Sequence, residues 1–366
     1  MAGLYVHIPF CRSKCAYCDF YSTPRMERME EYVDAIASEY ALRRDEIAEG
    51  FTTLYIGGGT PSALPVPLLR RLLDALIRPE MEEITIEANP DDMTPAYARD
   101  IASMGVNRVS MGFQSMIDAE LRAVGRRHDA RQSIKAVAAL RDYDIGNISG
   151  DLIYGLPSQT PESWRQSVET VMSMELPHLS AYSLSYEPGT RLSAMLAAGK
   201  IQELDDETCG QMYSFLCQAA RAHGYEHYEI SNFARPGYRS RHNSSYWDYT
   251  PYLGLGCAAH SFDGNIRRYN PSNLKAYIDS ITNGENCYIA ESETDTDRYN
   301  DYLITALRTS DGIDLGKMSS RFDPAQLIAA AKPFLDKGTL RRDGDRIYFP
   351  EEAWLISDGV LRELII

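Results

Sequence analysis

Short β-branched runs alternate with helix-length amphipathic stretches over the first half of the chain. Six such apolar runs occur, at residues 4–8, 54–56, 84–87, 108–112, 148–153 and 179–184. Runs of this length and composition are typical of strands, and the stretches between them include apolar residues at the i, i+3, i+4 spacing of a helix. Consecutive strand–helix units predict a parallel sheet with right-handed crossovers and helices on its outer face.

The number of units sets the architecture that we expect. Eight units would close a TIM barrel, whereas the six found here predict an α/β fold with an open, partial (βα)6 barrel. Two helices have clear predicted starts, because Thr94 precedes Pro95 and Thr160 precedes Pro161, a hydroxyl N-cap followed by proline at N1. In such a barrel, functional side chains are expected at the carboxyl ends of the strands.

The alternation stops after about residue 186. Residues 203–224 predict a helix that ends at Gly224, and residues 225–270, rich in Tyr, Asn, Gly and Ser, predict extra strands and long loops. The acidic run 291–297 is the predicted linker, followed by two or three helices and a hairpin that turns at Asp343 and Gly344, a winged-helix-like arrangement. The predicted division is a partial barrel over 1–224, strands and loops packing on it over 225–290, and a small C-terminal helical domain over 291–366.

Composition and charge narrow the class of protein. The chain has 366 residues, with 37 Lys and Arg against 52 Asp and Glu, a net charge of −15. An acidic surface argues against nucleic-acid binding, which depends on neutralising phosphates. No stretch reaches the roughly 18 consecutive apolar residues of a membrane-spanning helix, and the start of the chain has no signal-peptide pattern. We therefore expect a cytoplasmic protein, compatible with peripheral contact with a membrane and with a homodimer.

Cys11, Cys15 and Cys18 form a C-x3-C-x2-C set in the loop after the first predicted strand. Thiolates are the usual ligands of iron–sulfur clusters, which normally take four, so three would leave one iron open to an exchangeable ligand. Zinc is the rival, with His7 completing a Cys3His set, although His7 lies inside the predicted strand. The third interpretation, three unrelated buried thiols, is the weakest because the other four cysteines are scattered.

A glycine-rich turn follows the second predicted strand. Gly57, Gly58 and Gly59 would let the backbone approach a ligand closely, and Thr60 adds a hydroxyl. Their spacing matches neither a P-loop nor a dinucleotide-binding fingerprint. Taken alone, the turn is equally well explained as a tight connection between strand and helix.

Three more polar residues stand at or near strand ends, namely Glu87, Gln114 and Asp151. A carboxylate within an apolar strand such as 148–153 is costly to bury unless a partner compensates it. Each residue alone is as readily structural as functional. Together they predict a pocket at the carboxyl edge of the sheet.

The segment from Tyr5 to Cys18 resembles the signature of radical S-adenosylmethionine (SAM) proteins, in the version used by the oxygen-independent coproporphyrinogen oxidase family. The resemblance covers about residues 5–270 and, more weakly, the C-terminal domain. It implies a 4Fe–4S cluster on the cysteine triplet, SAM on the unique iron, and a reduced cluster that splits the sulfonium to give a deoxyadenosyl radical. The positions that match the family's SAM-binding residues are Tyr5, Tyr17, Gly58, Gly59, Thr60, Glu87, Gln114, Arg126 and Asp151. Arg126 is chosen over the adjacent Arg127 because it stands twelve residues after Gln114.

Departures from the oxidase pattern point to another branch of the family. The oxidases carry a further cysteine two residues after the third, where this chain has Phe20. They also have a long segment before the motif, whereas Tyr5 begins the first strand almost at once. Both departures fit the heme chaperone branch, whose H-N-x-x-Y-W motif resembles His242-Asn243-Ser244-Ser245-Tyr246-Trp247.

That motif makes heme the expected cargo. Imidazole is a common axial ligand of heme iron, so His242 is the candidate ligand, and Tyr246 and Trp247 could pack on a porphyrin face. Cys257 and His260 are further candidate ligands. The alternative is a histidine hydrogen-bonded within a loop, beside two aromatic residues of a second small core.

Two functions from different classes follow. The first is a binding and transfer protein, a radical SAM-fold heme chaperone that holds heme and passes it to acceptor hemoproteins, with respiratory proteins among the candidates. The second is an enzyme, an oxygen-independent coproporphyrinogen III oxidase or a catalyst of another radical reaction on a tetrapyrrole. Phe20 and the short segment before Tyr5 favour the first. We expect a 4Fe–4S cluster, SAM and heme as bound groups and assign no catalytic residue.

Overall fold

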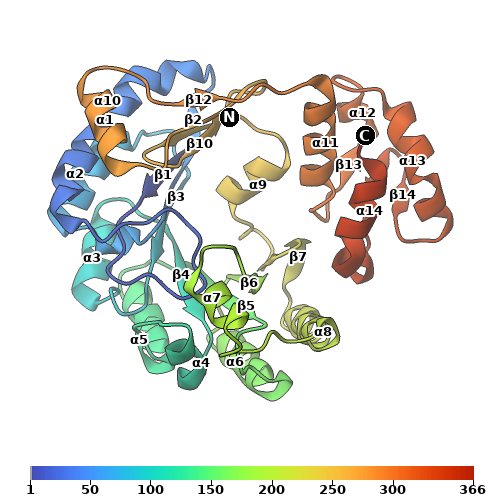
Figure 1. Ribbon diagram of the computed structural model, residues 1–366, viewed down its shortest axis with the longest axis horizontal. Helices are drawn as coiled ribbons and strands as arrows, with labels where there is room; N and C mark the ends of the chain where they lie inside the picture. Colours follow the sequence, from blue (N-terminus) through green and yellow to red (C-terminus); the bar gives the residue numbers. More distant parts are fainter. Residues whose placement is uncertain (1) are drawn as a thin grey trace.

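Six parallel strands form the centre of the main sheet, as the sequence pattern predicts. The computed structural model describes residues 2–366, and these strands are hydrogen-bonded in chain order. Their order and direction give the predicted partial barrel (Figure 1). The strands are β1 (Ala2–Ile8), β2 (Phe51–Gly58), β3 (Glu83–Ala88), β4 (Arg108–Gln114), β5 (Asn147–Tyr154) and β6 (His178–Ser183).

Helices cover the outer face of these strands (Figure 1). Both predicted N-caps are present: the Thr94 hydroxyl accepts from the Tyr97 backbone N–H, and Thr160 forms a capping box with Ser163. The apolar helix faces pack against outward-facing strand residues such as Leu4 to form the main core. The helices between the strands are α1 (Met29–Arg43), α2 (Val66–Leu76), α3 (Pro95–Ser103), α4 (Asp118–Ala123), α5 (Ala130–Arg141) and α6 (Pro161–Ser173).

The strands predicted within 225–290 extend both edges of the same sheet. On one edge β8 (Asn232–Ala234) pairs antiparallel with β6, and β7 (Glu226–Glu229) pairs with β8. On the other edge β9 (Tyr252–Leu255) pairs parallel with β1. It is followed by β10 (His260–Phe262), β11 (Arg267–Tyr269) and β12 (Ile289–Ala290), which gives a sheet of twelve strands among the described residues.

A helix that the sequence pattern did not predict lies within this region. α9 (Arg241–Trp247) lies between the two edges of the sheet, across the open side of the barrel (Figure 1). The Glu83 carboxylate of β3 accepts the backbone N–H groups of Arg241 (3.0 Å) and His242 (2.9 Å). A carboxylate at a helix N-terminus satisfies otherwise unpaired N–H groups and favours the helix dipole. Because Glu83 is distant in sequence, local periodicity carries little sign of this helix.

Three other helices complete the barrel region: α7 (Arg191–Ala197), α8 (Asp206–Ala222) and α10 (Leu274–Thr282). α8 is the helix predicted over 203–224, and it ends two residues before Gly224, whose φ is +78°. Glycine adopts this left-handed conformation without the strain that a Cβ would cause, which explains why the helix stops there.

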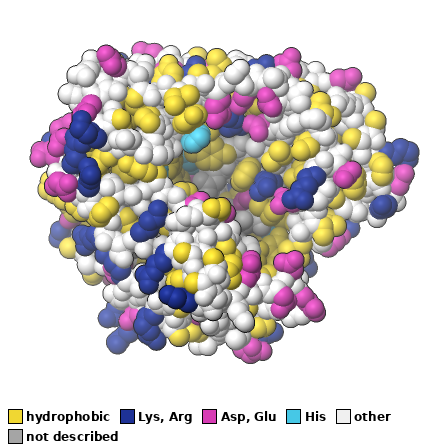
Figure 2. Space-filling model, viewed as in Figure 1, with side chains coloured by type: hydrophobic (Ala, Val, Ile, Leu, Met, Phe, Trp, Pro, Cys, Tyr) yellow, Lys and Arg dark blue, Asp and Glu magenta, His cyan; other side chains and the backbone are white. Residues whose placement is uncertain are grey.

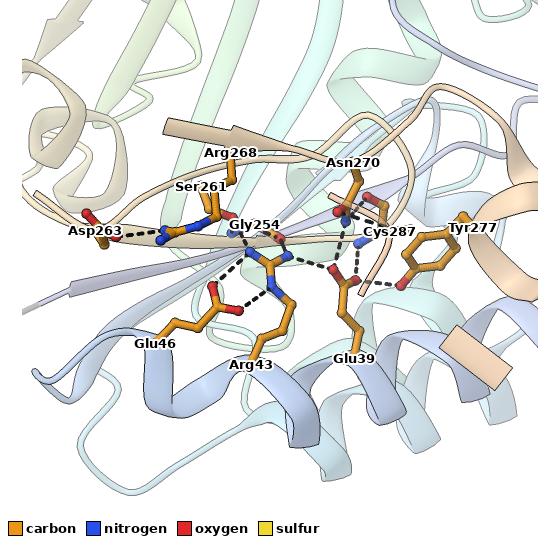
Figure 3. A network of polar contacts seen from close by, with 11 residues as sticks. Glu39, Arg43, Glu46, Gly254, Ser261, Asp263, Arg268, Asn270, Tyr277 and Cys287 are labelled. Atoms are coloured by element: carbon orange, nitrogen blue, oxygen red, sulfur yellow. Dashed lines mark hydrogen bonds and ion pairs between the residues drawn. The ribbon is translucent and has the colours of Figure 1, made fainter. Parts of the chain in front are cut away.

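A buried network of polar contacts ties the outer strands to α1 (Figure 3). Arg43 and Glu39, whose side chains are each 1% exposed, form an ion pair of 2.8 Å between Nη1 and Oε1. Arg43 also donates to the backbone oxygen of Gly254 (3.2 Å) and to Oγ of Ser261 (3.1 Å). Glu39 accepts from Nδ2 of Asn270 at 2.7 Å. These contacts connect α1 to β9, β10 and the segment after β11.

The C-terminal region has a core of its own, formed by residues such as Leu303, Leu327 and Ile347. It is built from helices, as predicted, with a three-stranded sheet in which the expected hairpin turns at Gly344 (φ +58°). Its elements are α11 (Asp295–Ala306), β13 (Ile313–Asp314), α12 (Leu315–Met318), α13 (Pro324–Asp336), β14 (Arg341–Asp343), β15 (Arg346–Tyr348), the 3-10 helix η4 (Glu351–Ile356) and α14 (Ser357–Leu364).

The linker predicted at 291–297 is shorter in the structure: residues 291–294 lie outside any helix or strand, whereas α11 begins at Asp295. Thr294 caps α11, and the acidic residues Asp295 and Asp297 lie in its first turn. Acidic side chains are favoured at a helix N-terminus, so the charges that resembled a solvated linker belong to a helix start. Among residues 2–366, no helix combines the length and apolar character needed to cross a membrane.

Candidate cofactor site

A cavity of about 400 Å³ lies at the carboxyl ends of the central strands. Cys11, Cys15 and Cys18 all line it. Eight of the nine residues predicted for SAM line the same cavity, namely Tyr17, Gly58, Gly59, Thr60, Glu87, Gln114, Arg126 and Asp151. The predicted position of the site at this edge of the barrel therefore agrees with the structure.

The cysteine loop follows β1 and folds back against it. The backbone N–H of Cys11 donates to the Thr23 carbonyl at 3.1 Å, and the Thr23 N–H donates to the Pro9 carbonyl at 2.7 Å. All three thiols are unpaired. The Thr60 hydroxyl oxygen lies 3.4 Å from Sγ of Cys11, and Nη1 of Arg126 lies 3.5 Å from Sγ of Cys15. Two polar side chains of the cavity therefore lie directly beside sulfurs of the triplet.

His7 is not available to complete a zinc site with the three cysteines. Its Nδ1 lies 3.1 Å from the Tyr5 hydroxyl, and its Nε2 lies 3.0 Å from the Tyr21 carbonyl, so both ring nitrogens are engaged. A structural zinc ion takes four ligands. The Cys3His zinc alternative therefore does not fit.

The glycine turn at the end of β2 passes directly beside the cysteine loop. A Cβ at Gly59 would lie 2.9 Å from the Phe10 carbonyl oxygen and 3.0 Å from the Pro9 carbonyl. Gly58 has φ +111°, and its N–H donates to Oε2 of Glu87 at 3.0 Å. The glycines are therefore required by close backbone approach, as well as by the turn itself.

Two carboxylates face the cavity from neighbouring parts of the sheet. Glu87 accepts from the Tyr55 hydroxyl at 2.9 Å, and burial raises its pKa to about 7. Asp151 accepts from the hydroxyls of Ser110 (2.9 Å) and Ser149 (2.8 Å), and burial likewise raises its pKa. Buried carboxylates with raised pKa values are suited to binding an ammonium group or hydroxyl donors.

Arg126 lies inside the cavity and Arg127 outside it. Nη2 of Arg126 donates to the Gly112 carbonyl and to Oδ1 of Asn89, both at 2.7 Å, while its Nε is buried without a partner. Arg127 instead pairs with Asp91 at 2.9 Å. The buried, partly unpartnered guanidinium of Arg126 is therefore the one placed to bind an anionic group.

Tyr5 is the one predicted SAM residue that does not line the cavity. Its ring stacks on Tyr55, with centroids 6.2 Å apart, and burial raises its pKa. It lies behind Tyr55 in the barrel interior, where it can support the cavity wall without contacting a ligand in this conformation. Several further residues line the cavity without having been predicted for it from the sequence, namely Tyr55, Asn89, Ser110, Tyr182 and Asn243. Tyr182 and Asn89 lie at strand ends and could have been found by that rule.

His242 lies deep in the barrel and is fully buried. Its Nδ1 is 2.8 Å from Oγ1 of Thr53, and its Nε2 is 2.9 Å from the Tyr246 hydroxyl. Burial lowers the pKa of His242 to about 3, so the ring is neutral. With both nitrogens hydrogen-bonded and no exposed surface, the ring cannot bind heme iron in this conformation.

The other residues proposed for heme lie in different places. Tyr246 and Trp247 line a second cavity of about 250 Å³ beside the C-terminal region. Cys257 is buried two residues after the end of β9, where its backbone N–H donates to the Tyr32 hydroxyl at 2.9 Å. His260 is exposed on β10, where its ring stacks on Tyr269 with centroids 5.6 Å apart. Neither Cys257 nor His260 lines the cavity of the cysteine triplet.

Two different family models match the barrel and the C-terminal region of this chain. The family model described as the Radical SAM superfamily matches residues 5–171, and that described as the HemN C-terminal domain matches residues 294–356. The heme chaperone HemW of Bacillus subtilis is 31% identical over 371 residues, which cover 98% of this chain and 98% of that protein. The chain belongs to the HemW family of heme chaperones.

Other relatives place the HemW family among radical SAM proteins. The heme chaperone HemW of Lactococcus lactis is 31% identical and covers 99% of this chain and 97% of that protein. The mitochondrial radical S-adenosyl methionine domain-containing protein 1 of Bos taurus is 35% identical, over 71% of this chain and 60% of that protein. The solved structure of coproporphyrinogen III oxidase (HemN) from Escherichia coli matches with a TM-score of 0.85 at 23% identity, covering 100% of this chain and 90% of that one. This likeness confirms the fold.

Membership of the radical SAM superfamily implies a 4Fe–4S cluster and SAM. The donor set fits both groups, because three unpaired thiols and an unpartnered Arg126 Nε share one cavity. When bound, a reduced cluster supplies an electron to the sulfonium of SAM.

Proposed function

We propose that this protein is a heme chaperone that holds heme beside its radical SAM site and passes it to acceptor hemoproteins. The observation that carries the proposal is the position of α9. Asn243 of this helix lines the cofactor cavity, and Trp247, one turn further on, lines the cavities next to the C-terminal region. One short helix that carries the family motif therefore touches both sites.

In this proposal Cys11, Cys15 and Cys18 hold the cluster. The Gly58–Gly59 backbone and Thr60 would hold the amino end of SAM, with Glu87 nearby to compensate its charge. Arg126 would pair with the SAM carboxylate, since its free Nε points to an anionic partner. Tyr17, Gln114 and Asp151 would complete the binding of SAM, and Tyr5 would support the wall through Tyr55.

Heme is proposed to bind where α9 faces the C-terminal region. Trp247 lines both the 250 Å³ cavity and a neighbouring one of about 400 Å³, and its indole N–H is buried without a partner. The second cavity is also lined by three basic residues, Arg239, Lys317 and Arg346, and by three acidic ones, Asp248, Asp311 and Asp314. Arg239 pairs with Asp311 at 3.1 Å, so Lys317 and Arg346 are the residues proposed to pair with heme propionates. Figure 2 shows that this face of the molecule is hollowed over α9, with hydrophobic side chains along the hollow and basic side chains beside it.

His242 has a supporting role in this proposal. Its bond to the Tyr246 hydroxyl fixes one end of the aromatic pair, and Thr53 fixes the ring from the other side. An axial-ligand role, as predicted from the motif, would require the ring to leave its buried position. Loss of His242 should therefore act on heme binding through Tyr246.

Heme titration of the cluster-loaded protein tests the proposal. A saturable Soret shift is expected, and Trp247→Ala should weaken heme affinity by about tenfold or more, because a porphyrin loses an aromatic face. Tyr238→Ala is the matched control, since Tyr238 is 43% exposed and lines neither cavity. Heme transfer from the loaded protein to a heme-free acceptor should then be measured. A titration unaffected by Trp247→Ala would place heme elsewhere.

A second incubation separates the chaperone from an oxidase. Phe20, which stands where the oxidases have a further cysteine, is 63% exposed and lines the cofactor cavity. Anaerobic incubation with coproporphyrinogen III, SAM and a reductant should give no protoporphyrinogen. Product formation would restore the oxidase hypothesis. We place the protein in the cytoplasm, a reducing compartment that suits its seven unpaired cysteines.

A further inference from the structure

Cys217, His227 and Glu351 bring three metal-ligand atoms together where α8, β7 and η4 meet. Nδ1 of His227 lies 2.9 Å from Oε1 of Glu351 and 3.8 Å from Sγ of Cys217. Among residues 2–366, this is the one group of at least three His, Cys, Asp or Glu side chains whose ligand atoms all lie within 4.8 Å. It lies apart from the cofactor cavity, and no residue lines both that cavity and the cavity beside this cluster.

The spacing is close to what a tetrahedral divalent ion needs. With zinc–nitrogen and zinc–oxygen bonds of about 2.0–2.1 Å and a zinc–sulfur bond of about 2.3 Å, tetrahedral angles put N and O about 3.3 Å apart and N and S about 3.6 Å apart. The observed separations of 2.9 Å and 3.8 Å differ from these by only a few tenths of an ångström. Small side-chain shifts would therefore close the site around an ion.

The surroundings of His227 also resemble those of a metal ligand. Its Nε2 lies 3.4 Å from the Ile230 carbonyl, the position where a ligating histidine donates its second N–H to fix the ring. The ring is held between Phe233, with centroids 3.9 Å apart, and Trp354, with centroids 4.1 Å apart. A neutral imidazole without a metal has one N–H for two facing acceptors, Glu351 and Ile230, so one contact is left unsatisfied.

One side of the cluster opens to solvent. A cavity of about 290 Å³ is lined by the three ligand residues and by Arg221, Arg341 and Arg346. Arg221 pairs with Oε2 of Glu351, the carboxylate oxygen that does not face His227. The cavity provides an entry path, and its arginines favour water, hydroxide or a small anion at a fourth coordination position.

We propose that Cys217, His227 and Glu351 bind a borderline divalent ion of the zinc class, which joins the C-terminal region to the edge of the barrel. Sulfur, nitrogen and oxygen donors together suit zinc better than magnesium or calcium, which prefer oxygen alone. Binding releases the Cys217 thiol proton to solvent, and the thiolate and carboxylate then balance the two charges of the ion.

Metal retention by the cluster-loaded, full-length protein tests this site, because loading with iron occupies the signature cysteines. After equilibration with Zn²⁺ and gel filtration, elemental analysis should find about one zinc per chain in addition to the cluster iron. X-ray absorption at the zinc edge should show one sulfur at about 2.3 Å with nitrogen or oxygen ligands. Thermal unfolding should move to higher temperature with zinc, since the ion binds the folded state.

Cys217→Ser and Glu351→Gln should each reduce retained zinc to background while iron content and circular dichroism stay unchanged. Cys209→Ser, on the same helix and outside the cluster, should retain zinc fully and serves as the control. The proposal is overturned if the wild-type protein retains no zinc, if Cys217→Ser retains as much as wild type, or if the zinc spectrum shows two or more sulfur ligands.

Discussion

His242 and Tyr246 lie one helical turn apart on α9, and Nε2 of His242 is 2.9 Å from the Tyr246 hydroxyl. The neutral ring can accept from this hydroxyl while its other nitrogen donates to Oγ1 of Thr53 at 2.8 Å. The bond connects a buried position in the barrel with a residue that lines an outer cavity. A substitution or ligand on one side of α9 is therefore expected to alter the structure on its other side.

Removal of the Tyr246 hydroxyl should destabilise the fold. Tyr246→Phe leaves Nε2 of His242 buried without a partner, which costs about 1–3 kcal/mol of unfolding free energy. Urea denaturation measures the change. Tyr238→Phe removes the same atom from a tyrosine that is 43% exposed, and its effect should stay within about 0.5 kcal/mol. Equal stability of Tyr246→Phe and wild type would show that the hydrogen bond has no energetic role.

SAM affinity should depend on Arg126 and scarcely on Arg127. Arg126→Ala removes a buried guanidinium from the cavity, and a hydrogen bond to a charged group contributes about 1.5–3 kcal/mol, or roughly 10- to 150-fold in Kd. Arg127→Ala loses a partly exposed ion pair with Asp91, which contributes about 1 kcal/mol or less to stability. Equilibrium dialysis of SAM with proteins of equal iron content compares the two. A larger loss of affinity in Arg127→Ala would reverse the assignment.

The close packing of the glycine turn against the cysteine loop should make Gly59→Ala defective in cofactor retention. The new methyl group would meet the backbone of Pro9 and Phe10 at 2.9–3.0 Å, so the loop that carries Cys11 must move. Iron bound after reconstitution should fall well below wild type. Gly146→Ala adds the same methyl group where no atom lies within 4 Å, and it should bind iron normally. Normal iron content in both variants would show that the loop tolerates the displacement.

Glu87 should give the SAM-free protein a stability that decreases as pH rises. Its pKa is raised to about 7 by burial, whereas an unfolded glutamate titrates near 4.5. Between these values the folded state binds more protons than the unfolded state, so the unfolding free energy falls with increasing pH. The slope approaches about 1.4 kcal/mol per pH unit for a full proton difference. Unfolding of wild type and Glu87→Gln from pH 4.5 to 7 should show a flatter profile for the variant, and parallel profiles would contradict the assignment.

Removal of one partner of the buried ion pair between Glu39 and Arg43 on α1 should lower the free energy of unfolding. Glu39→Ala leaves Arg43 with Glu46 (3.1 Å) as its remaining acidic partner, but it removes the acceptor of the buried Tyr277 hydroxyl and of the Gly256 N–H. Each buried donor left without a partner costs about 1–3 kcal/mol, and the loss should be visible in urea denaturation. Lys332→Ala breaks the exposed i,i+4 pair with Asp336 on α13 and should change stability by about 0.5 kcal/mol or less. If Glu39→Ala were as mild as Lys332→Ala, the network of Figure 3 would not be what anchors the outer strands.

Much of the barrel and its candidate cofactor site can be predicted from the sequence because both depend on local sequence patterns. Each central strand coincides with a short apolar run of its own, and Thr94 and Thr160 cap helices through groups within a few residues. Parallel strands of a barrel end at one edge, so residues at the ends of separate strands, such as Gly59, Glu87 and Gln114, must meet there. The position of the cysteine triplet follows from the same rule.

Sequence alone therefore determined the order of the central strands, the edge of the sheet where the cavity lies and part of the set of side chains that line it. Tertiary structure alone decided the rest: that residues 225–290 extend both sheet edges, that α9 crosses the open barrel, that His242 is buried, and that Cys217 and His227 meet Glu351. These features depend on contacts between residues far apart in the chain, such as Glu83 with α9 and Arg43 with Gly254. A local sequence pattern cannot identify a contacting residue that is distant in the chain and comes close only when the protein folds.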